Sequence, residues 1–489
     1  MTALSVPESV PKAVGIGDAP ASPAGPVEPS EPLVLPPGDP HARWVQTIRF
    51  SARPLSFNLR AHRRYGDVWQ LRLATRREPF VVTCHPDHVQ SLMKARPADA
   101  PSLTGESPLR PILGPDSVLT SVGDRHLRQR RLLLPPFHGE AVKRYMEMIS
   151  AVAEREIDRW PLHQDFALAP RMQAVTLDVI MSGVFGIDGR PEPGSTGDRL
   201  RRIVRRLLGA STTPLFQLVE LMNVSHSEAR GVLAQMIAMV DRPLFAMIRE
   251  RRADAAASRR GDVLSLLLEA RDEDGRPLTD QELRDELLAL VLAGHETTAN
   301  SLAWIFERLL RTPDAYTRLR ELVRVGGEDA DAYVEATIHE GMRNRPVIPM
   351  VVRMVKRPWR FGEYVVPAQT PVAVSIIALH HRADLYPEPL VFRPERFLER
   401  RPPEDPGSDR SGLAFIKPGT YTWMPFGGGI RRCLGASLAM AEQRVVLAAI
   451  ARRTDLIAPD PQPERARQRN VTTIPNRGAR IAVTARYPA

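Results

Sequence analysis

Apolar residues recur at intervals of three and four over most of the chain between about residue 138 and residue 311. The segments EAVKRYMEMISAVAEREIDRW and EARGVLAQMIAMVDRPLFAMIRERR both follow this spacing, which is typical of amphipathic helices. No repeat or low-complexity linker interrupts the region, and a further helix is predicted from Cys433 onward. The pattern therefore indicates one large and mainly helical unit.

Strand patterns stand on either side of this helical region. YGDVWQLRL and PFVVTCHP predict two strands joined by a polar turn, and GEYVVPAQTPVAVSIIALHH predicts another strand-rich patch. A proline-rich coil follows to about residue 420. Residues 1–40 are rich in proline, alanine and serine without periodicity, so they are expected to form a disordered leader. The predicted fold is mainly α with small β-sheets (α+β), as a single domain over residues 41–489.

The segment PLTDQELRDELLALVLAGHETTANSLAWIFERLLR predicts one long apolar helix, opened by a capping box between Thr279 and Glu282. Such a helix of about thirty residues is about 45 Å long and should cross the middle of the domain. The run from Ala293 to Thr298 near its centre is unfavourable for a helix core, since it contains glycine and two threonines. It is either a kink with satisfied polar groups or an opening for a small ligand, equipped with an acid and an alcohol.

Composition limits the class of protein. The chain has 489 residues, of which 43% are hydrophobic, so a large core is available. No stretch approaches the ~18 to 20 apolar residues of a spanning helix. The N-terminus, MTALSVPESVPKAVG, lacks the basic and apolar regions of a signal peptide. We therefore expect a cytoplasmic protein without a membrane anchor.

The net charge of +10 comes from 67 basic and 57 acidic residues, and only five of the basic residues are lysines. Basic side chains are spread along the whole sequence rather than gathered in one tract, unlike a nucleic-acid footprint. No nucleic acid is expected as a partner. A basic docking face for an acidic protein is the preferred interpretation.

The two cysteines, Cys84 and Cys433, stand in different settings. A reducing compartment argues against a disulfide between them, and a structural zinc site would need local pairs of ligands. Cys84 follows an apolar run and is expected to be a buried small hydrophobe. Cys433 is therefore expected to act alone.

Two arginines and a glutamate form a second candidate cluster. Glu340 and Arg343 are three residues apart, hence on one helical face, and such a pair is most often a solvated ion pair. Arg396 lies in a coil held by prolines. A carboxylate shared by both guanidinium groups could pin that coil to the helix.

The segment FGGGIRRCLG surrounds Cys433 with glycines that permit close approach to a cofactor and free backbone donors. A cysteine at the start of a helix also has its thiolate stabilised by the positive helix end. Because no other cysteine or histidine is near, one protein ligand must suffice. Haem, which brings its own equatorial ligands, meets that demand.

With these motifs in place, the chain resembles the cytochrome P450 family from about residue 40 to the C-terminus. The cysteine loop Phe426-x-x-Gly429-x-Arg431-x-Cys433-x-Gly435 is similar to the loop that ligates haem in that family. Three other motifs occur in the family's order: Ala293-Gly294-x-Glu296-Thr297-Thr298, Glu340-x-x-Arg343 and Phe392-x-Pro394-Glu395-Arg396-Phe397. The resemblance implies the P450 fold, with haem b between a long central helix and the cysteine loop.

The resemblance also implies roles on the cysteine side of the haem. Cys433 would be the thiolate ligand of the iron, and Glu340, Arg343 and Arg396 would form a structural ion-pair triad. Histidine at position 126 departs from the tryptophan that family members often carry, and a merely basic helix face is the alternative for that segment. The expected cofactor-binding residues are His126, Arg130, Ala293, Arg353, Phe426, Gly429, Arg431, Cys433 and Gly435.

On the opposite side, Glu296 and Thr297 would deliver protons to bound O2, the implied co-substrate. Electrons would come from a ferredoxin or flavodoxin with its NAD(P)H-dependent reductase, and the enzyme is expected to be a monomer. Arg431, Arg432, Arg128 and Arg131 would gather on the docking face, with ordinary solvated charge as the alternative for Arg128 and Arg432.

By the same resemblance, residues 100–120 and 200–225 and a set of aliphatic side chains would line the substrate pocket. The named positions are Leu290, Val347, Ile348, Met350, Val351, Val471 and Ile474, beside Ala293 and Thr297. They favour a terpene, fatty acid or steroid. Two other functions stay open: a peroxide-driven oxygenase or isomerase, and a non-catalytic haem-thiolate sensor.

Overall fold

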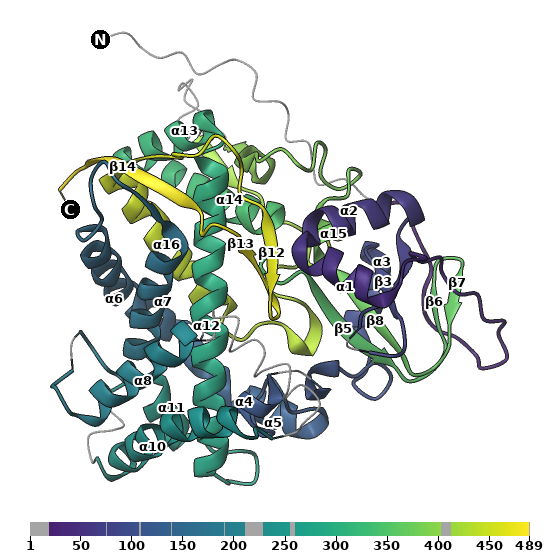
Figure 1. The fold of residues 1–489 in the computed structure, drawn as a ribbon, viewed down its shortest axis with the longest axis horizontal. Helices are drawn as coiled ribbons and strands as arrows, with labels where there is room; N and C mark the ends of the chain where they lie inside the picture. The colour runs from purple at the N-terminus through teal and green to yellow at the C-terminus, as the bar shows by residue number, and fades with distance from the viewer. Residues whose placement is uncertain are drawn as a thin grey trace.

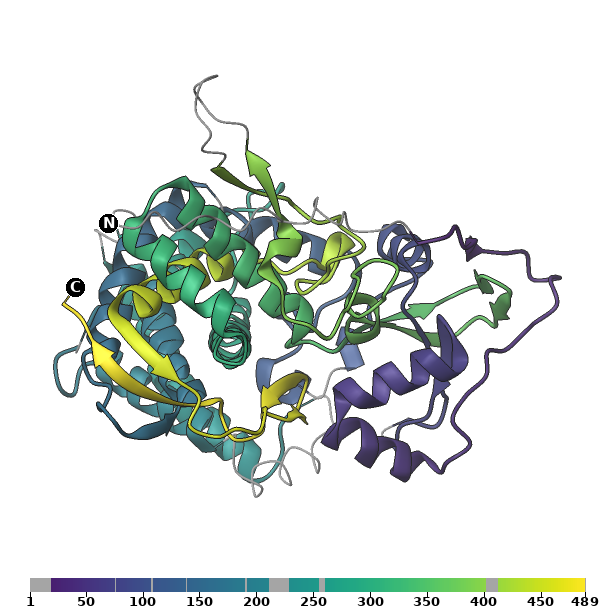
Figure 2. The same cartoon turned by 90° about the horizontal axis from the view of Figure 1, so that it is seen from above.

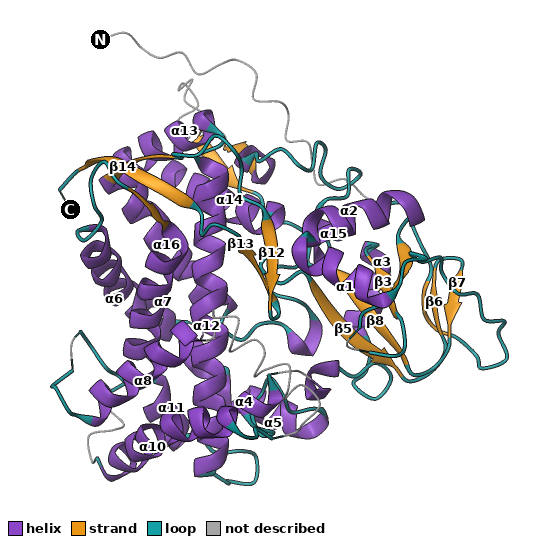
Figure 3. Ribbon diagram, viewed as in Figure 1, coloured by secondary structure: helices purple, strands orange, loops and turns teal. Residues whose placement is uncertain are grey.

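A computed structural model describes residues 19–74, 76–106, 109–137, 139–189, 191–210, 228–254, 260–401 and 412–488. Figure 1 shows a helical part around one long upright helix, α12, and a sheet-rich part at the side of the molecule. Helices dominate, and the strands form small sheets (Figure 3). The predicted fold class, mainly α with small β-sheets, is confirmed.

The helices of the helical part are mostly long and amphipathic. They are α4 (Arg110–Leu113), α5 (Gly123–Leu133), α6 (Glu140–Ile157), α7 (Leu168–Phe185), α8 (Thr196–Ala210), α10 (Val232–Ala253), α11 (Val263–Glu269), α12 (Asp280–Leu309), α13 (Pro313–Val325), α14 (Glu328–Asn344) and α16 (Ala436–Arg453). The sheet-rich part carries shorter helices: α1 (Arg43–Ala52), α2 (Pro54–Tyr65), α3 (Pro86–Lys94) and α15 (Ile376–His380). Short 3₁₀ turns include η4 (Pro394–Phe397) and η5 (Gly429–Arg431).

The largest sheet has the strand order β2-β3-β8-β5, in which β3 and β8 are parallel and the other pairs antiparallel. Its strands are β2 (Val68–Leu71), β3 (Phe80–Thr83), β8 (Thr370–Ser375) and β5 (Met350–Val355). The strand patterns of YGDVWQLRL and PFVVTCHP correspond to β2 and β3, which pair in a buried antiparallel ladder. This sheet places β5 next to the helical part.

The other sheets have two or three strands. Their strands are β1 (Ala24–Pro26), β6 (Trp359–Phe361) and β7 (Tyr364–Val366); β11 (Thr454–Ile457), β14 (Arg480–Arg486) and β4 (Asp165–Ala167); β12 (Ala466–Arg469) and β13 (Thr472–Pro475); and β9 (Leu398–Arg401) and β10 (Gly412–Phe415). The β12–β13 hairpin lies beside α12 in Figure 1.

The helix α12 is the centre of the fold, and Figure 2 looks nearly along it. Its capping box between Thr279 and Glu282 is formed as the sequence predicted. The helix is buried on most sides and packs against α7, α10, α14 and α16. Because most of its surface is covered by protein, the few accessible positions along it are informative.

The expectation of a disordered leader over residues 1–40 is wrong for residues 19–40. Strand β1 adds to the edge of β6, Val34 pairs with Val365, and Gly38 pairs with Gln70. The segment lacks an apolar periodicity, and it is ordered instead by these backbone hydrogen bonds. Residues 1–18 lie outside the described part of the chain.

Among the helices in the described ranges, none combines the length and the apolar character needed to cross a bilayer.

Candidate functional site

The cysteine loop is shaped by its glycines and by backbone hydrogen bonds. Gly429 has φ +64°, and a Cβ there would collide with the carbonyl oxygen of Met93. The Cys433 N–H donates to the Phe426 carbonyl oxygen at 2.9 Å, which closes the loop. The helix α16 begins at Ala436, so the prediction of a helix from Cys433 onward was three residues early. Cys433 therefore precedes the helix and projects from the loop.

Two opposing influences act on the pKa of the Cys433 thiol. Burial raises the pKa of the thiol, while the Gly435 N–H and the charges of Arg432 and Arg130 favour the thiolate. Yet the Cys433 side chain has accessible surface, and a Cβ added to Gly435 would meet no atom within 4 Å. The sulfur is thus surrounded by protein and still keeps accessible surface. Such a setting suits a sulfur that ligates a buried metal, since ligation removes the proton.

Four basic side chains gather beside this loop, and we call them the basic cluster. They are His126 and Arg130 from α5, Arg353 from β5 and Arg431 from η5. The pKa of His126 is lowered to about 3 by burial and by the charges of the three arginines. These charges act on His126 because the four side chains lie close together. Burial also lowers the pKa values of Arg353 and Arg431 to about 10.

The arginines of the basic cluster donate to backbone carbonyls, and Arg353 also donates to the Met93 sulfur at 3.6 Å. Arg431 donates to the carbonyl oxygens of Val118, at 3.0 Å, and Ser121. Arg130 donates to the Arg432 carbonyl oxygen at 2.7 Å. Arg353 donates to the adjacent Val352 carbonyl at 3.2 Å.

Within the described residues, no carboxylate forms an ion pair with any member of the basic cluster. Buried charges are stable when they are paired. The cluster therefore fits an anionic group that the chain itself does not supply.

One face of α12 is accessible near its middle. Leu290, Ala293 and Thr297 are three and four residues apart, hence on one face, and all three keep accessible surface although the helix is largely buried. The Thr297 hydroxyl donates to the Ala293 carbonyl oxygen at 2.7 Å. The helix continues unbroken over Asp280–Leu309. The side chains of this face, rather than a break in the backbone, thus offer space to a ligand.

The opposite side of the same turn explains the other unusual residues of the motif. A Cβ on Gly294 would lie 3.0 Å from Ile180 of α7, so the glycine permits close packing. The Thr176 hydroxyl of α7 donates to the His295 carbonyl oxygen at 2.8 Å. Burial lowers the pKa of His295 to about 4, so this side chain is neutral at pH 7.

Glu296, next to Thr297, is also partly exposed, but its carboxylate is already engaged by other side chains. Its Oε1 accepts from Arg469 Nη2 at 2.7 Å, Arg469 Nε at 3.0 Å and Thr472 Oγ1 at 2.9 Å. Both partners belong to the β12–β13 hairpin, at the two ends of its turn. We call this arrangement the hairpin clamp. It holds the carboxylate of the expected proton donor in an ion pair.

The side chains of Glu340, Arg343 and Arg396 meet in a fully buried cluster. Arg343 binds both oxygens of Glu340, at 2.6 and 2.8 Å, and Arg396 Nε lies 3.3 Å from Glu340 Oε1. Arg343 also donates to the carbonyl oxygens of His380 and Pro389. The alternative of a solvated pair does not describe this cluster, because Glu340 and Arg343 have no exposed side-chain surface.

The expected substrate-pocket side chains differ in exposure. Ile348, Met350 and Val351 are half-buried, like Leu290, and Val471 at the hairpin turn is 41% exposed. Val347 and Ile474 are only 8% and 6% exposed, so they pack behind the accessible side chains and offer little surface to a substrate. Of the two expected lining segments, residues 107–108 and 211–225 lie outside the described ranges.

The expected docking arginines do not gather as free charges. Arg128 pairs with Asp272 and Glu282 at 2.7 and 2.8 Å, Arg131 pairs with Glu273, and Arg431 turns toward backbone carbonyls. Only Arg432 of the four is exposed without a carboxylate partner in the described ranges. Arg128 and Arg131 therefore present no free charge, and their place on a docking face stays a prediction.

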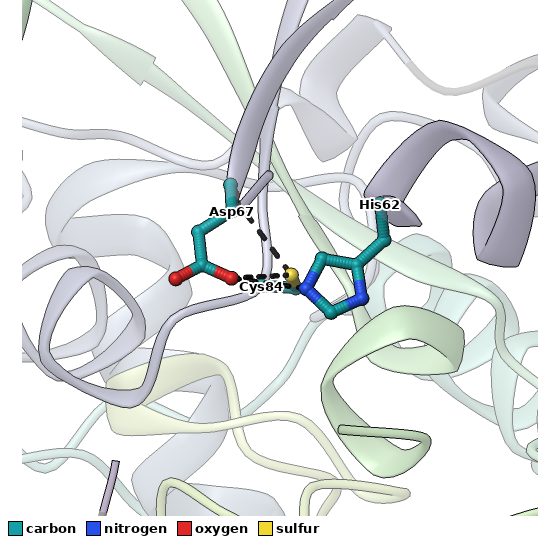
Figure 4. Close-up of side chains that lie close together, drawn as sticks. All are labelled: His62, Asp67 and Cys84. Carbon is teal, nitrogen blue, oxygen red and sulfur yellow. Dashed lines mark hydrogen bonds and ion pairs between the residues drawn. The ribbon is translucent and has the colours of Figure 1, made fainter. Parts of the chain in front are cut away.

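Another group of potential metal ligands is His62, Asp67 and Cys84, shown in Figure 4. The His62 ring and the Asp67 carboxylate are 3.0 Å apart, and Cys84 Sγ lies 3.7 Å from the same oxygen. Burial raises the pKa of the Cys84 thiol far above its usual value, and Arg382 binds Asp67. An arginine thus already occupies the carboxylate that a cation would need. Cys84 is completely buried, as the sequence predicted.

Sequence reasoning missed the hairpin clamp and the two carboxylates that hold the loop before α5. Glu286 of α12 accepts the Val118 N–H at 2.9 and 3.0 Å, and Asp285 accepts the Asp116 N–H at 3.0 Å. Adjacent acids in the first half of a buried helix were a signal that could have been used. Arg469, 173 residues from Glu296, gave no local signal.

The chain is similar to known proteins over most of its length. The family described as "Cytochrome P450" matches residues 36–482. The chain is 36% identical to cytochrome P450 137 of Mycobacterium tuberculosis, over 91% of this chain and 90% of that protein. It is 35% identical to cytochrome P450 135A1 of the same species, over 91% and 94%.

Solved structures of similar fold are more distant in sequence. The retinoic acid bound cyanobacterial CYP120A1 has a TM-score of 0.74 at 21% identity, over 93% of this chain and 100% of that chain. The heme domain of cytochrome P450DA has a TM-score of 0.72 at 23% identity, over 93% and 99%.

Proposed function

Since the chain belongs to the cytochrome P450 family and is therefore a haem-thiolate monooxygenase, we propose that it oxidises hydrophobic small molecules of the terpene, fatty acid or steroid class. Members of the family bind haem b and use O2 as co-substrate. The observation that carries the proposal is the placement of Cys433, which is surrounded by protein yet keeps accessible surface, beside a basic cluster without a carboxylate partner in the described ranges.

We assign Cys433 as the ligand of the haem iron and the basic cluster as the binding site of the propionates. Phe426 packs among aromatic neighbours next to the loop, with its ring 6.2 Å from that of Trp423, and stiffens the loop. The Gly429 conformation and the space beside Gly435 shape its backbone. When bound, the haem supplies the iron at which O2 is activated with two electrons, and one oxygen atom enters the substrate.

The proton-delivering residues are Thr297 and Glu296. The Thr297 hydroxyl lies on the accessible face of α12 and donates to Ala293. A rotation about χ1 would redirect that proton toward a ligand on this face. Glu296 is partly exposed but engaged by the hairpin clamp. The carboxylate must leave Arg469 before it can relay a proton, so the clamp controls the supply.

The accessible candidates for the substrate wall are aliphatic, from Leu290 through Ile348, Met350 and Val351 to Val471. None carries a charge that would anchor an ionic ligand. Burial of apolar surface would then supply most of the binding free energy, about 25 cal/mol for each Å². This composition supports a nonpolar substrate.

Members of the family typically receive electrons from redox partners. For this chain we propose a ferredoxin or flavodoxin with its NAD(P)H-dependent reductase. The exposed Arg432 of the cysteine loop supports an acidic donor protein.

An optical titration of the ferric protein against a panel of terpenes, fatty acids and steroids tests the substrate class. A compound that displaces water from the iron shifts the Soret band from the low-spin to the high-spin position. A saturable shift with a member of the panel supports the proposal. A normal thiolate-haem spectrum with no shift by any nonpolar compound, but a shift by a charged one, would overturn it.

A further inference from the structure

An open, arginine-lined pocket of about 350 Å³ lies at the start of α1, far along the chain from the cysteine loop. It is lined by residues 40–43, Arg72, Arg77 and Pro79. Trp44 and Ile48 follow directly on α1. We call the pocket and these two side chains together the α1 surface.

The three arginines of the pocket carry uncompensated charge. In the described ranges, Arg43, Arg72 and Arg77 form no ion pair with a carboxylate. The nearest acids along the chain have other partners, since Asp39 binds His41 and Glu78 lies 3.3 Å from Arg76. Guanidinium groups that converge on an open pocket without an acid suit a phosphate, which they bind in a bidentate manner.

The helix α1 turns apolar side chains straight outward. Gln46 and Phe50 form its buried face, and Gln46 anchors the helix by accepting from Arg72 N at 3.0 Å and donating to the Asp39 carbonyl at 3.0 Å. Trp44 and Ile48 are one turn apart on the opposite face, 64% and 59% exposed. Exposed on a fixed helix, the tryptophan and the isoleucine can bind to an apolar surface outside the protein.

The charge around the α1 surface is concentrated. Residues 41–79 contain nine arginines and two acidic residues, so they carry seven of the chain's ten net positive charges. The other 450 residues are close to neutral as a group. Although basic residues occur along the whole sequence, their excess over acids belongs to this region.

We propose that the α1 surface binds the surface of an anionic phospholipid bilayer. The pocket takes a lipid phosphate, Trp44 and Ile48 enter the interface, and the surrounding arginines are attracted by the negative surface potential. Tryptophan is favoured at this depth because its ring is apolar and its N–H is polar. A bilayer matches both features at once, since it presents phosphates directly above apolar chains. The inference does not depend on the proposed substrate.

Flotation of the full-length, haem-loaded protein with vesicles tests the proposal. We expect binding to vesicles of phosphatidylcholine with phosphatidylglycerol and at least tenfold weaker binding to phosphatidylcholine alone. Binding should weaken as salt is raised, because the charges are exposed and screened. Equal binding to both kinds of vesicle, or binding to neither, would overturn the proposal.

Two sets of variants locate the contact. Trp44→Ala with Ile48→Ala, and Arg43→Ala with Arg72→Ala and Arg77→Ala, should each reduce binding at least tenfold. The matched controls should leave it unchanged: Val325→Ala, at an apolar side chain 86% exposed elsewhere, and a triple alanine variant at the exposed Arg155, Arg400 and Arg452. An equal loss in the controls would contradict a specific surface.

Two further measurements distinguish a bilayer from a misfolded variant and from a free anion in the pocket. An unchanged haem absorption spectrum shows that each variant is folded, and the wild-type salt dependence needs no variant. Inorganic phosphate at millimolar concentration should compete only weakly, because it brings no apolar phase. Complete competition by phosphate would identify the pocket as a site for the free anion and overturn the bilayer as its occupant.

Discussion

Thr297 and Thr298 are neighbours in sequence with different surroundings. The Thr297 hydroxyl lies on the accessible face of α12, whereas Thr298 is 5% exposed. The Thr297→Ala variant should therefore release more hydrogen peroxide and make less product per electron consumed, with product lower by roughly a hundredfold, the lower end of the usual contribution of one proton-transfer group. Thr298→Ala is the matched control and should keep the wild-type ratio.

The contrary result for Thr297 is equally clear. Unchanged product formation and peroxide release in Thr297→Ala would show that this hydroxyl does not deliver protons. The peroxide-driven and sensor alternatives would then regain weight, because neither needs the acid–alcohol pair.

Arg469 controls a different step, the availability of the Glu296 carboxylate. Removal of the arginine in Arg469→Ala should raise oxygen consumption without substrate by roughly two- to fivefold. That factor corresponds to an ion pair worth about 0.5 to 1 kcal/mol, a value in the range of surface pairs. Thr472→Val should have a smaller effect in the same direction. Oxygen uptake with an electron-donor system measures both.

Arg467→Ala, two residues earlier on β12, is the control for the charge change, since Arg467 is exposed and has no carboxylate partner in the described ranges. A fall in oxygen consumption in Arg469→Ala would mean that the clamp supports proton delivery instead of restraining it.

At the scale of elements, α12 holds the loop between α4 and α5 through Glu286. The loop in turn supplies the Val118 and Ser121 carbonyls that orient Arg431. Glu286→Ala leaves the buried Val118 N–H unpaired, which should lower the free energy of unfolding by about 1 to 3 kcal/mol. It should also speed the loss of haem to apomyoglobin, because Arg431 loses its support.

Glu286→Gln is the conservative control, since an amide oxygen can still accept the Val118 N–H. It should recover most of the stability and most of the haem retention. If Glu286→Ala lost stability but released haem at the wild-type rate, the link from α12 to Arg431 would be refuted.

The elements that the sequence predicted best are those with strong local signals. The helix α12 has its apolar run and capping box within one segment, and β2 and β3 are short apolar runs separated by a turn. Residues 19–40 were misjudged because their order comes from pairing with other segments, and the partner of β1 lies more than 300 residues away. The composition of a segment does not indicate a pairing partner that is distant in sequence.

The residues of the candidate site also fall into those with local sequence signals and those without. Cys433, Glu340 and Arg343 stand in motifs whose spacing is local, and the structure brings the last two together with Arg396. The hairpin clamp and the ion pairs of Arg128 and Arg131 depend on side chains distant in sequence. Pairing between separate elements decides these charges, and no single segment reveals it.

At the scale of the whole molecule, burial keeps several histidines neutral. It lowers the pKa values of His88, His295 and His339 to about 4 and that of His380 to about 3. His380 Nε2 accepts the Met424 N–H at 2.7 Å, which requires an unprotonated ring nitrogen.

These depressed pKa values predict acid lability. The unfolded state binds more protons than the folded state between about pH 6.5 and pH 4, so stability falls as the pH drops through this window. At pH 5 each fully buried histidine should cost about 2 kcal/mol relative to pH 7. Urea unfolding of the haem-loaded protein between pH 5 and 7.5 measures the slope.

His380→Gln should make that slope shallower, because an amide oxygen can occupy the position of the ring nitrogen and accept the Met424 N–H without titrating. His41→Gln, at an exposed histidine, is the control. A stability that stays constant from pH 7 to pH 5 would contradict the picture of buried neutral histidines.

The most direct test of the account is the absorption spectrum of the reduced, carbon monoxide-bound protein in three forms. Wild type and Cys84→Ala should both show the Soret position typical of a thiolate ligand, because Cys84 is buried and bonded away from the site. Cys433→Ser should lose that position while its far-UV circular dichroism stays that of wild type. A thiolate spectrum that survived in Cys433→Ser, or vanished in Cys84→Ala, would contradict the assignment of Cys433 as the haem ligand.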